Sequence, residues 1–275
     1  CNVYLDAGAY PGSFIENACN TAYAPYNIPN LQLRGFDIVT NKPKTGAYRA
    51  PGTPNSALAV ETAIDEISKK LKIDPVQLRL KNAADKGTRK ADGTIYPEIG
   101  MIETANSVLE HQHYSESLPK SSSKSFKVGR GIAFGYSGNI NGAATVIGNV
   151  VEDGTITLIT GAVDIGGTRI SIAQQFAEVL GIDPTLINPT VADTDSIGYT
   201  SASVGSSASH KNGWAAYQCA LDVKDQLEER VSKIWNVPKN TVVFGNGYAK
   251  SKTDSKLIMS LKELASLLDE TGGPI

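Results

Sequence analysis

The sequence lacks the long apolar runs and the one-sided charge that are typical of membrane proteins and of nucleic-acid-binding proteins. No apolar stretch approaches the roughly 18 residues of a transmembrane helix, and no basic-then-apolar leader opens the chain. Acidic and basic residues are interleaved along the 275 residues, and the formal net charge is only −2. We therefore expect neither a membrane nor a nucleic acid among its partners.

Cysteine is scarce as well. Cys1, Cys19 and Cys219 lie far apart, without the paired spacing of a zinc or iron–sulfur site, and they are too few for a secreted disulfide framework. A reducing, cytoplasmic compartment is the expected location. The chain begins with cysteine and ends on the loop-like residues LDETGGPI, so we expect it to be a piece of a longer protein.

Common catalytic and nucleotide-binding motifs are missing. The sequence contains neither G-x-x-x-x-G-K-[ST] nor G-x-G-x-x-G, and it has no nucleophile elbow and no H-E-x-x-H. His111 and His113 stand two apart, and on a helix this spacing points them to different faces and disfavours a shared metal. Asp193, Thr194 and Asp195 could bind a cation, but a polar loop after a strand explains them more simply. From spacing alone we assign no catalytic residue and no metal ligand.

The patterns that are present indicate two domains with mixed α/β layers. A Ser- and Lys-rich stretch, SLPKSSSKSFKVGRG, separates two segments with regular apolar spacing, which predicts domains over residues 1–120 and 126–275. The first is expected to hold a strand at NVYLDAGAY, loop and short strand over residues 20–43, a helix capped by Thr53, and a helix from Asp74-Pro75. The second is expected to hold strands at GRGIAFGYS, AATVIGNVVEDG and TITLITGAV with a turn at Asp153-Gly154, a helix at RISIAQQFAEVLGI, a strand at INPTVADT, a long helix through Trp214 and Leu227, a short strand at TVVFGNGYAKS and a helix at SLKELASLLDE.

Three stretches place glycine or small hydroxyl residues directly ahead of a helix: AYRAPGTPN, DIGGTRIS and VGSSASHKNG. The first N–H groups of a helix have no internal partner, and the helix dipole adds positive charge there, so anions bind at such ends. Arg49, in the first stretch, is suited to bind a phosphate or an oxygen-rich ring through two parallel hydrogen bonds. Each stretch taken alone also fits an ordinary helix cap, and Arg49 also fits a solvated surface residue.

At these same three places the chain resembles the molybdenum-cofactor-binding region of the xanthine dehydrogenase/aldehyde oxidoreductase family, the molybdenum hydroxylases. The similar stretches are TNKPKTGAYRAPGTPNSALAVETAIDEISKKLKIDPVQLRLKNA, TGAVDIGGTRISIAQQFAEVLGI and ADTDSIGYTSASVGSSASHKNG. They follow one another in the family's order and cover essentially the whole chain. The resemblance implies an α/β (α+β) fold with two mixed-sheet domains of the molybdenum-cofactor-binding type: the end of the first over residues 1–120 and the start of the second over 126–275.

The resemblance also implies a cofactor and its contacts. The cofactor is molybdenum-molybdopterin, with or without an added cytosine dinucleotide, and iron–sulfur clusters and FAD belong to other domains or subunits. Arg49 is placed near the pterin, Ile165, Gly166 and Gly167 along it, and Gly205 and Ser206 at its phosphate. The implied partners are the rest of the molybdenum subunit, the iron–sulfur and flavin subunits or domains, and a small-molecule substrate.

The family's reaction is the oxidation of an aldehyde or N-heterocycle with water as the oxygen source. This chain has Arg49-Ala50-Pro51 where many xanthine-oxidising members have Arg-Gly-Phe, which favours a substrate other than a purine. It has Gly166-Gly167-Thr168 where many members have Gly-Gln-Gly, and it contains no Gly-x-Gly-Glu, the pattern of the family's general base. We expect this piece alone to bind no cofactor and to be inactive. Two alternatives are a non-catalytic cofactor-binding or assembly module and an unrelated phosphate-binding α/β protein.

Overall fold

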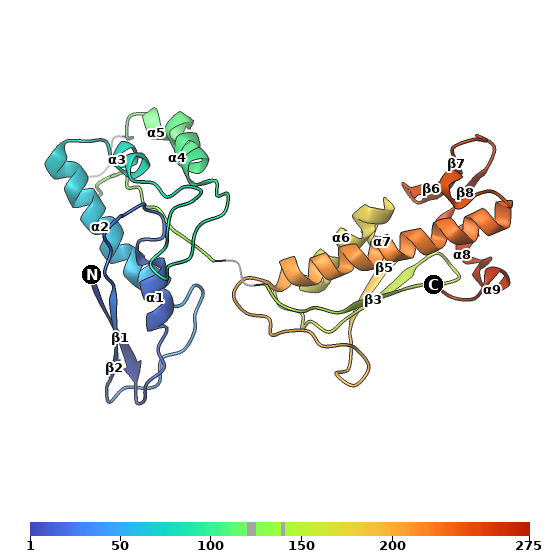
Figure 1. The fold of residues 1–275 in the computed structure, drawn as a ribbon, viewed down its shortest axis with the longest axis horizontal. Helices are drawn as coiled ribbons and strands as arrows, with labels where there is room; N and C mark the ends of the chain where they lie inside the picture. Colours follow the sequence, from blue (N-terminus) through green and yellow to red (C-terminus); the bar gives the residue numbers. More distant parts are fainter. Residues whose placement is uncertain (120–124, 139–140) are drawn as a thin grey trace. The chain divides into compact units, whose positions relative to one another are not determined.

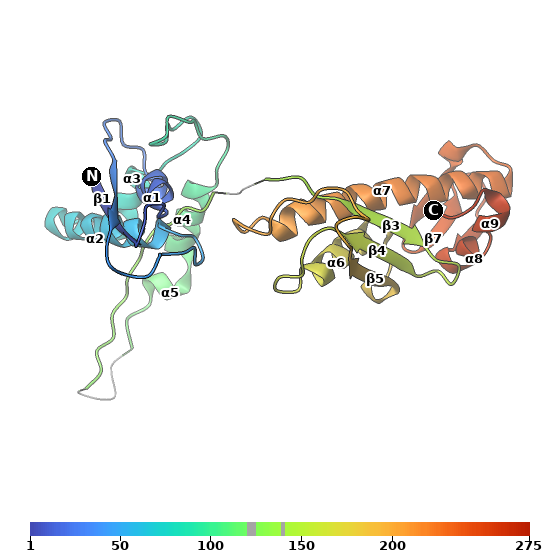
Figure 2. The ribbon, with the colours of Figure 1, turned by 90° about the horizontal axis from the view of Figure 1, so that it is seen from below.

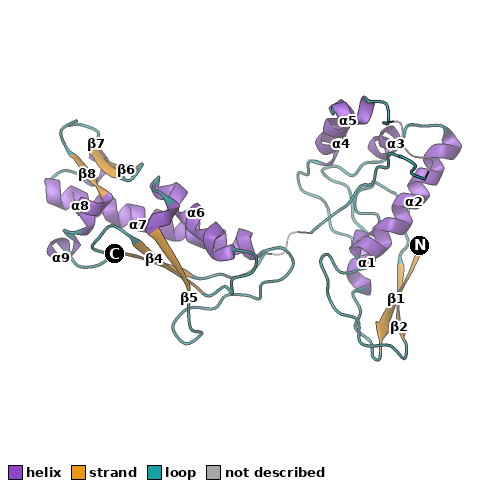
Figure 3. Ribbon diagram, turned by 180° about the vertical axis from the view of Figure 1, so that it is seen from behind, coloured by secondary structure: helices purple, strands orange, loops and turns teal. Residues whose placement is uncertain are grey.

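The computed structural model describes residues 1–119, 125–138 and 141–275. These residues form two compact units, Cys1–Gly138 and Asn139–Ile275, and each unit is described by itself. Both units mix helices with small sheets (Figure 3), so the expected α/β (α+β) class is confirmed. The division predicted from sequence between residues 120 and 126 stays a prediction, since residues 120–124 lie outside the described ones.

The first unit is built on a parallel pair of strands joined by a helix. Strand β1 (Asn2–Gly8) pairs with β2 (Arg34–Val39), starting at Asn2 opposite Arg34, and α1 (Ile15–Ala22) connects them. The long helix α2 (Thr53–Leu71) packs beside α1 and is followed by α3 (Pro75–Lys81), α4 (Met101–Glu110) and α5 (Gln112–Ser115) (Figure 1). Asp74 caps α3 as predicted, by accepting hydrogen bonds from the N–H groups of Val76 and Gln77 at 2.8 and 3.0 Å.

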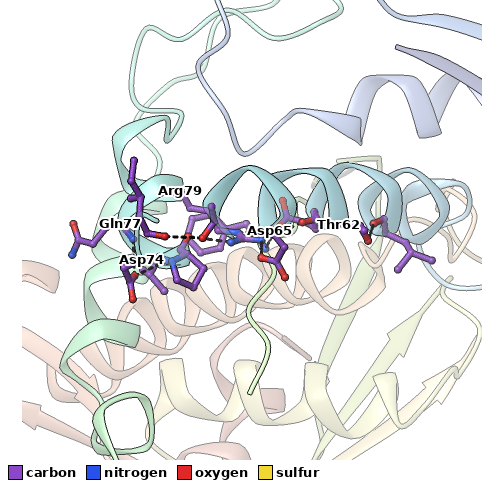
Figure 4. Close-up of polar contacts among 12 residues, drawn as sticks. Thr62, Asp65, Asp74, Gln77 and Arg79 are labelled. Carbon is purple, nitrogen blue, oxygen red and sulfur yellow. Dashed lines mark hydrogen bonds and ion pairs between the residues drawn. The ribbon is translucent and has the colours of Figure 1, made fainter. Parts of the chain in front are cut away.

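A buried ion pair links α2 and α3. Arg79 is fully buried, and its Nε donates to Glu61 Oε2 at 2.8 Å while its Nη2 donates to Asp65 Oδ1 at 2.9 Å. Figure 4 shows the Arg79 side chain reaching toward Asp65 on α2. The Glu61 carboxylate also accepts from the Tyr26 hydroxyl and, at 2.8 Å, from the N–H of Phe134. One buried carboxylate therefore joins α2, α3, the loop after α1 and the segment around Phe134.

Three features of the first unit differ from the sequence-based expectation. The stretch over residues 129–137, predicted as a strand, is a loop, because the Phe134 N–H bonds to Glu61 and its ring packs into the core of the unit. Helix α1 lies partly within the stretch predicted as loop and short strand. Helix α2 begins one residue early, so that Gly52 is its N-cap in place of Thr53.

The Tyr114 hydroxyl donates a 2.5 Å hydrogen bond to Asp74 Oδ2 and ties α5 to the start of α3. Burial and this bond raise the pKa of Tyr114 to about 12 from 10.0. Burial alone would raise the pKa of Asp74, but the bonds from Tyr114, Gln77 and Val76 lower it overall. The tyrosine therefore stabilises the fold below pH 10, and this contribution is lost as the pH rises through about 12.

We expect Tyr114→Phe to lower the free energy of unfolding of the first unit by about 1 kcal/mol at neutral pH. The difference from wild type should shrink above pH 10, where the tyrosine ionises, and at acid pH, where Asp74 is protonated. The difference in the free energy of unfolding is measured across this pH range by urea unfolding, with hydrogen exchange as the readout. Tyr10→Phe, at an exposed position of the same unit, is the control and should change little. A difference that stays constant from neutral pH to pH 12 would contradict this assignment.

The second unit places two helices on one face of a three-stranded sheet. Strands β3 (Val146–Val150) and β4 (Ile156–Thr160) form the predicted antiparallel hairpin, and β5 (Ile187–Val191) pairs with β4 in parallel. Helices α6 (Thr168–Leu180) and α7 (Ala208–Trp235) lie side by side on this sheet, as Figure 2 shows from the strand side. Their buried residues, among them Phe176, Leu180 and Leu227, form the core of the unit with Ile156 and Leu158.

The end of the second unit departs from the predicted pattern in two places. The stretch predicted as one short strand forms the hairpin β6 (Val242–Gly245) and β7 (Tyr248–Ser251), to which β8 (Ile258–Ser260) is added. The helix predicted at SLKELASLLDE is divided into α8 (Leu261–Ala265) and α9 (Leu268–Thr271), and at the break the Leu267 N–H bonds only three residues back, to the Leu264 carbonyl at 3.0 Å. Two single 3-10 turns, Pro184–Leu186 and Lys239–Thr241, precede β5 and β6.

Candidate functional site

Arg49 lies in the first unit, in an exposed loop directly before α2. Its φ is +28° and that of Ala50 is +50°, both in the left-handed region that side-chain-bearing residues rarely adopt. The N–H of Thr53 donates to the Ala50 carbonyl at 3.0 Å, and Asn17 on α1 donates to the Pro51 carbonyl at 2.5 Å. The loop is therefore fixed by hydrogen bonds on both sides of Pro51, while Arg49 is exposed.

Ile165, Gly166 and Gly167 form the turn between β4 and α6. Gly166 and Gly167 have φ values of +60° and +84°, and a Cβ at either position would meet no atom within 4 Å. Gly167 is the N-cap of α6, without a side-chain hydrogen bond, and Ile165 is 56% exposed beside it. The turn thus offers bare backbone next to an exposed apolar side chain, a surface suited to a flat ring with polar edges.

The positive end of α6 is already occupied by a carboxylate of the chain itself. Asp164 accepts hydrogen bonds from the N–H of Arg169 at 3.2 Å and from its Nε at 2.9 Å. The backbone bond from Arg169, followed by the side-chain bond, lowers the pKa of Asp164. Because this carboxylate lies at the helix end, a second anion is disfavoured there, and the glycine turn is better suited to a neutral group.

Gly205 and Ser206 are the central residues of a tight turn before α7. The N–H of Ser207 donates to the Val204 carbonyl at 3.3 Å, and Gly205 and Ser206 have φ values of +63° and +57°. Positive φ at both central residues is the pattern of a type I′ turn, which serine adopts only at a cost in free energy. Both residues are exposed, and Ser207, the N-cap of α7, makes no side-chain cap hydrogen bond. No carboxylate contacts this turn among the hydrogen bonds of the described residues, in contrast to α6.

The fold brings the Gly166–Gly167 turn and the Gly205–Ser206 turn to one edge of the sheet. Strands β4 and β5 are parallel, and α6 follows the carboxyl end of β4 while α7 follows that of β5. The helices run side by side, and at Gly213 on α7 a Cβ would come within 1.6 Å of the Gln175 side chain on α6. Since Gln175 lies about two turns into α6 and Gly213 about one and a half turns into α7, both helix N-termini lie at the same edge. Five of the six predicted residues therefore share one end of the second unit, and Arg49 belongs to the first.

The sequence analysis did not identify two residues near this edge. Asp164 caps α6 from outside the helix, and Lys211 is buried in the first turns of α7. A lysine at the positive end of a helix opposes the dipole preference, and this was the one signal available from sequence. Among the described residues no group of three or more His, Cys, Asp or Glu side chains is arranged to hold a metal ion.

Two family models match the chain in succession. The first molybdopterin cofactor-binding domain model covers residues 1–83, and the second covers residues 107–273, which include the glycine turn and the Gly205–Ser206 turn. The chain belongs to the molybdopterin cofactor-binding domain family. It corresponds to part of the large subunit of the molybdenum hydroxylases, as the resemblance implied.

Curated relatives of this family region align over much of the chain. A subunit of a probable xanthine dehydrogenase of Bacillus subtilis (strain 168) is 26% identical over 287 residues, which cover 98% of this chain and 38% of that protein. The aldehyde oxidoreductase of Megalodesulfovibrio gigas is 32% identical over 187 residues, covering 64% of this chain and 20% of the relative. The molybdopterin-binding region described here therefore spans less than two fifths of the length of these relatives.

Solved structures share the fold. The quinoline 2-oxidoreductase from Pseudomonas putida 86 superposes with a TM-score of 0.77 at 18% identity, covering 98% of this chain and 38% of that one. The aldehyde oxidoreductase from Desulfovibrio gigas gives a TM-score of 0.69 at 25% identity, with 92% and 30% covered. In the described part of this molybdopterin-binding chain, no helix combines the length and apolar character needed to cross a bilayer.

Proposed function

We propose that this chain forms one wall of the binding site for the pterin of a molybdenum cofactor. The observation that carries the proposal is the shared edge of the second unit, where left-handed turns at Gly166–Gly167 and Gly205–Ser206 precede two neighbouring helices. These turns lie within the residues that match the molybdopterin-binding family model. Domains over residues 1–120 and 126–275 are proposed as the end of the first and the start of the second cofactor-binding domain.

The backbone N–H groups and the guanidinium fit such a ligand, and the two turns would bind different parts of it. Ile165, Gly166 and Gly167 would lie along the pterin, whose ring is neutral, in keeping with the Asp164 carboxylate at the start of α6. Gly205 and Ser206 would bind the phosphate, because α7 begins there without a side-chain cap and its first N–H groups favour an anion. Arg49 would bind the pterin through its guanidinium.

The bound group would supply the redox chemistry for oxidising an aldehyde or N-heterocycle with water as the oxygen source. The residues of this chain would bind and orient it. We propose that the remaining chemistry comes from further parts of the molybdenum subunit and from iron–sulfur and flavin subunits or domains, and that this piece alone is inactive. Arg49-Ala50-Pro51 favours a substrate other than a purine. The cytosine dinucleotide form and a cytoplasmic location are part of the same proposal.

The proposal is tested by Arg49→Met in the natural protein that contains this sequence. Because a charge-assisted, bidentate contact contributes about 1.5 to 3 kcal/mol to binding, we expect the pterin and molybdenum content to fall by about tenfold or more. Content is measured by metal analysis and by fluorescence of the oxidised pterin. Arg34→Met, at an exposed position on β2, is the matched control and should keep the wild-type content. Equal content in both variants would remove Arg49 from the site, and wild-type protein without pterin would overturn the proposal.

A second candidate function is a binding or assembly module without catalysis. It is favoured by Gly167, which stands where many family members have a glutamine. The two candidates differ in one assay, the oxidation of aldehydes and N-heterocycles by natural protein that contains molybdenum in a one-to-one ratio. Turnover supports the enzyme, and its absence in fully loaded protein supports the module.

A further inference from the structure

Lys211 carries a buried positive charge that no carboxylate balances among the ion pairs of the described residues. It is 6% exposed and lies on the first turns of α7. Its ammonium donates to the Ser201 carbonyl at 2.8 Å, the Ser201 hydroxyl at 2.8 Å and the Ala202 carbonyl at 2.6 Å. All three N–H groups are therefore bonded, but only to neutral oxygens.

The position of Lys211 is unfavourable on two counts. Taking an ammonium out of water is costly unless hydrogen bonds and an opposite charge replace the water. The N-terminal end of a helix carries partial positive charge, which repels a cation. A lysine at this position is thus explained poorly by the stability of α7 alone, and its partners indicate what it does.

The partners of Lys211 lead directly to the Gly205–Ser206 turn. The Ala202 carbonyl that accepts from Lys211 also accepts from the N–H of Val204 at 2.9 Å, and Val204 opens the turn. The Val204 carbonyl in turn accepts from both the N–H and the hydroxyl of Ser207, at 3.3 and 2.7 Å. A continuous series of hydrogen bonds therefore runs from the buried ammonium to both ends of the strained turn.

The residues just before this series are also fixed. The Ser201 N–H donates to the Ala143 carbonyl at 2.9 Å, and the Thr200 hydroxyl accepts from the N–H of Thr145 at 3.1 Å. Residues 200 and 201 are thus anchored to the strand side of the unit, while Lys211 joins them to α7. Without the ammonium, the anchored residues would be joined to α7 only through the chain of the turn itself.

We propose that Lys211 is the positioning residue of the Gly205–Ser206 turn and the source of positive charge at that end of α7. Its ammonium holds residues 201 and 202, and so keeps the left-handed turn in the conformation that presents N–H groups to an anion. The charge itself, unbalanced within the described residues, favours a bound phosphate. This inference rests on the proposed function, in which the phosphate of the pterin binds at this turn.

The test uses Lys211→Met in the natural protein that contains this sequence, because methionine keeps the length of the side chain and removes its charge and donors. We expect the amides of residues 200–207 to exchange hydrogen about tenfold or more faster, while α7 beyond residue 216 keeps its protection. We expect pterin and molybdenum content to fall by about fivefold or more. Lys250→Met, at an exposed position on β7, is the matched control and should change neither quantity.

Two further variants separate charge from fold. Lys211→Arg keeps a cation with N–H donors, and we expect its pterin content to lie clearly above that of Lys211→Met; equal loss in both would overturn the role of the charge. Ser201→Ala removes, outside the helix, one acceptor of Lys211 together with the 3.0 Å bond from the same hydroxyl to the Ala143 carbonyl, so it tests the attachment of the turn even where Lys211→Met unfolds the unit. Its expected effect is about threefold faster exchange over residues 200–207, and wild-type exchange would overturn the proposal.

The two proposals fail in different ways. Wild-type protein without pterin would refute the proposed function, while the exchange measurement would still decide whether Lys211 holds the turn. Wild-type protein with pterin, combined with normal exchange or normal pterin content in Lys211→Met, would refute the role of Lys211 and leave the cofactor site standing.

Discussion

Replacing Arg79 with methionine should lower the free energy of unfolding of the first unit by about 3 to 5 kcal/mol, the range for breaking a buried ion pair from one side. Arg79 is fully buried, and it is the cation that faces the Glu61 carboxylate at 2.8 Å. Without it, Glu61 keeps the Tyr26 hydroxyl and the Phe134 N–H as donors but loses its opposite charge. The cost is that of an uncompensated buried carboxylate rather than of one hydrogen bond.

Hydrogen exchange measures the stability of the first unit separately, because the two units have different reporters. Both tryptophans, Trp214 and Trp235, lie in the second unit, so tryptophan fluorescence in urea reports that unit alone. The amides of α2 and α3 report the first unit. In Arg79→Met we expect their protection to fall by about 100- to 4,000-fold, since each 1.4 kcal/mol is a factor of ten, while the tryptophan transition stays in place.

Two variants make this prediction specific to the buried charge. Lys86→Met breaks the Lys86–Glu98 pair, whose side chains are 69% and 88% exposed, and should cost no more than about 1 kcal/mol. Glu61→Gln combined with Arg79→Met removes the unpaired charge, keeps one acceptor oxygen for the Phe134 N–H and turns an NH2 donor toward the Tyr26 hydroxyl oxygen, so it should be more stable than Arg79→Met alone. An Arg79→Met variant as stable as Lys86→Met would show that the pair contributes nothing beyond its surface counterpart.

Local patterns predicted much of the fold. The Asp74-Pro75 start of α3, the Asp153-Gly154 turn between β3 and β4, and the helices α6 and α7 all depend on residues close together in sequence. Capping residues, turn residues and apolar spacing act over a few positions, so one sequence is enough to detect them. The stretch over residues 129–137 failed for the opposite reason. Its alternating pattern is that of a strand, but the Phe134 N–H bonds to the Glu61 carboxylate, 73 positions away in the sequence.

The positions of the glycines in the candidate site could be predicted from the sequence, but the charges at the two helix ends could not. Gly166, Gly167 and Gly205 precede helices, and the sequence shows that much. The left-handed conformation of Ser206 is a property of the folded turn, because serine alone does not favour positive φ. Asp164 and Lys211 set the charge at the two helix ends through contacts that only the fold brings about. The sequence therefore indicated helix ends suited to an anion, whereas the structure distinguishes the end that already has a carboxylate from the end that has a cation.

Gly167→Leu should remove nearly all bound cofactor at little additional cost to the fold. A Cβ at Gly167 would meet no atom of the protein within 4 Å, so the leucine side chain would fill only the space in front of the turn. The left-handed backbone, with φ of +84°, would cost about 1 to 2 kcal/mol for any residue with a side chain. If the pterin lies along this turn, the leucine takes its place, and we expect pterin and molybdenum content to fall by about tenfold or more.

Gly273 provides a matched control within the same unit. It has φ of +88° and also has no atom within 4 Å of an added Cβ, so Gly273→Leu carries the same backbone strain and the same exposed side chain. Both variants should therefore lose similar stability in urea, as measured by tryptophan fluorescence, and only Gly167→Leu should lose the cofactor. Equal cofactor content in the two would mean that the space before α6 is not occupied by the pterin. Loss in Gly167→Leu alone would separate a contact with the ligand from strain in the backbone and from an added apolar side chain, because the two substitutions share both of these effects.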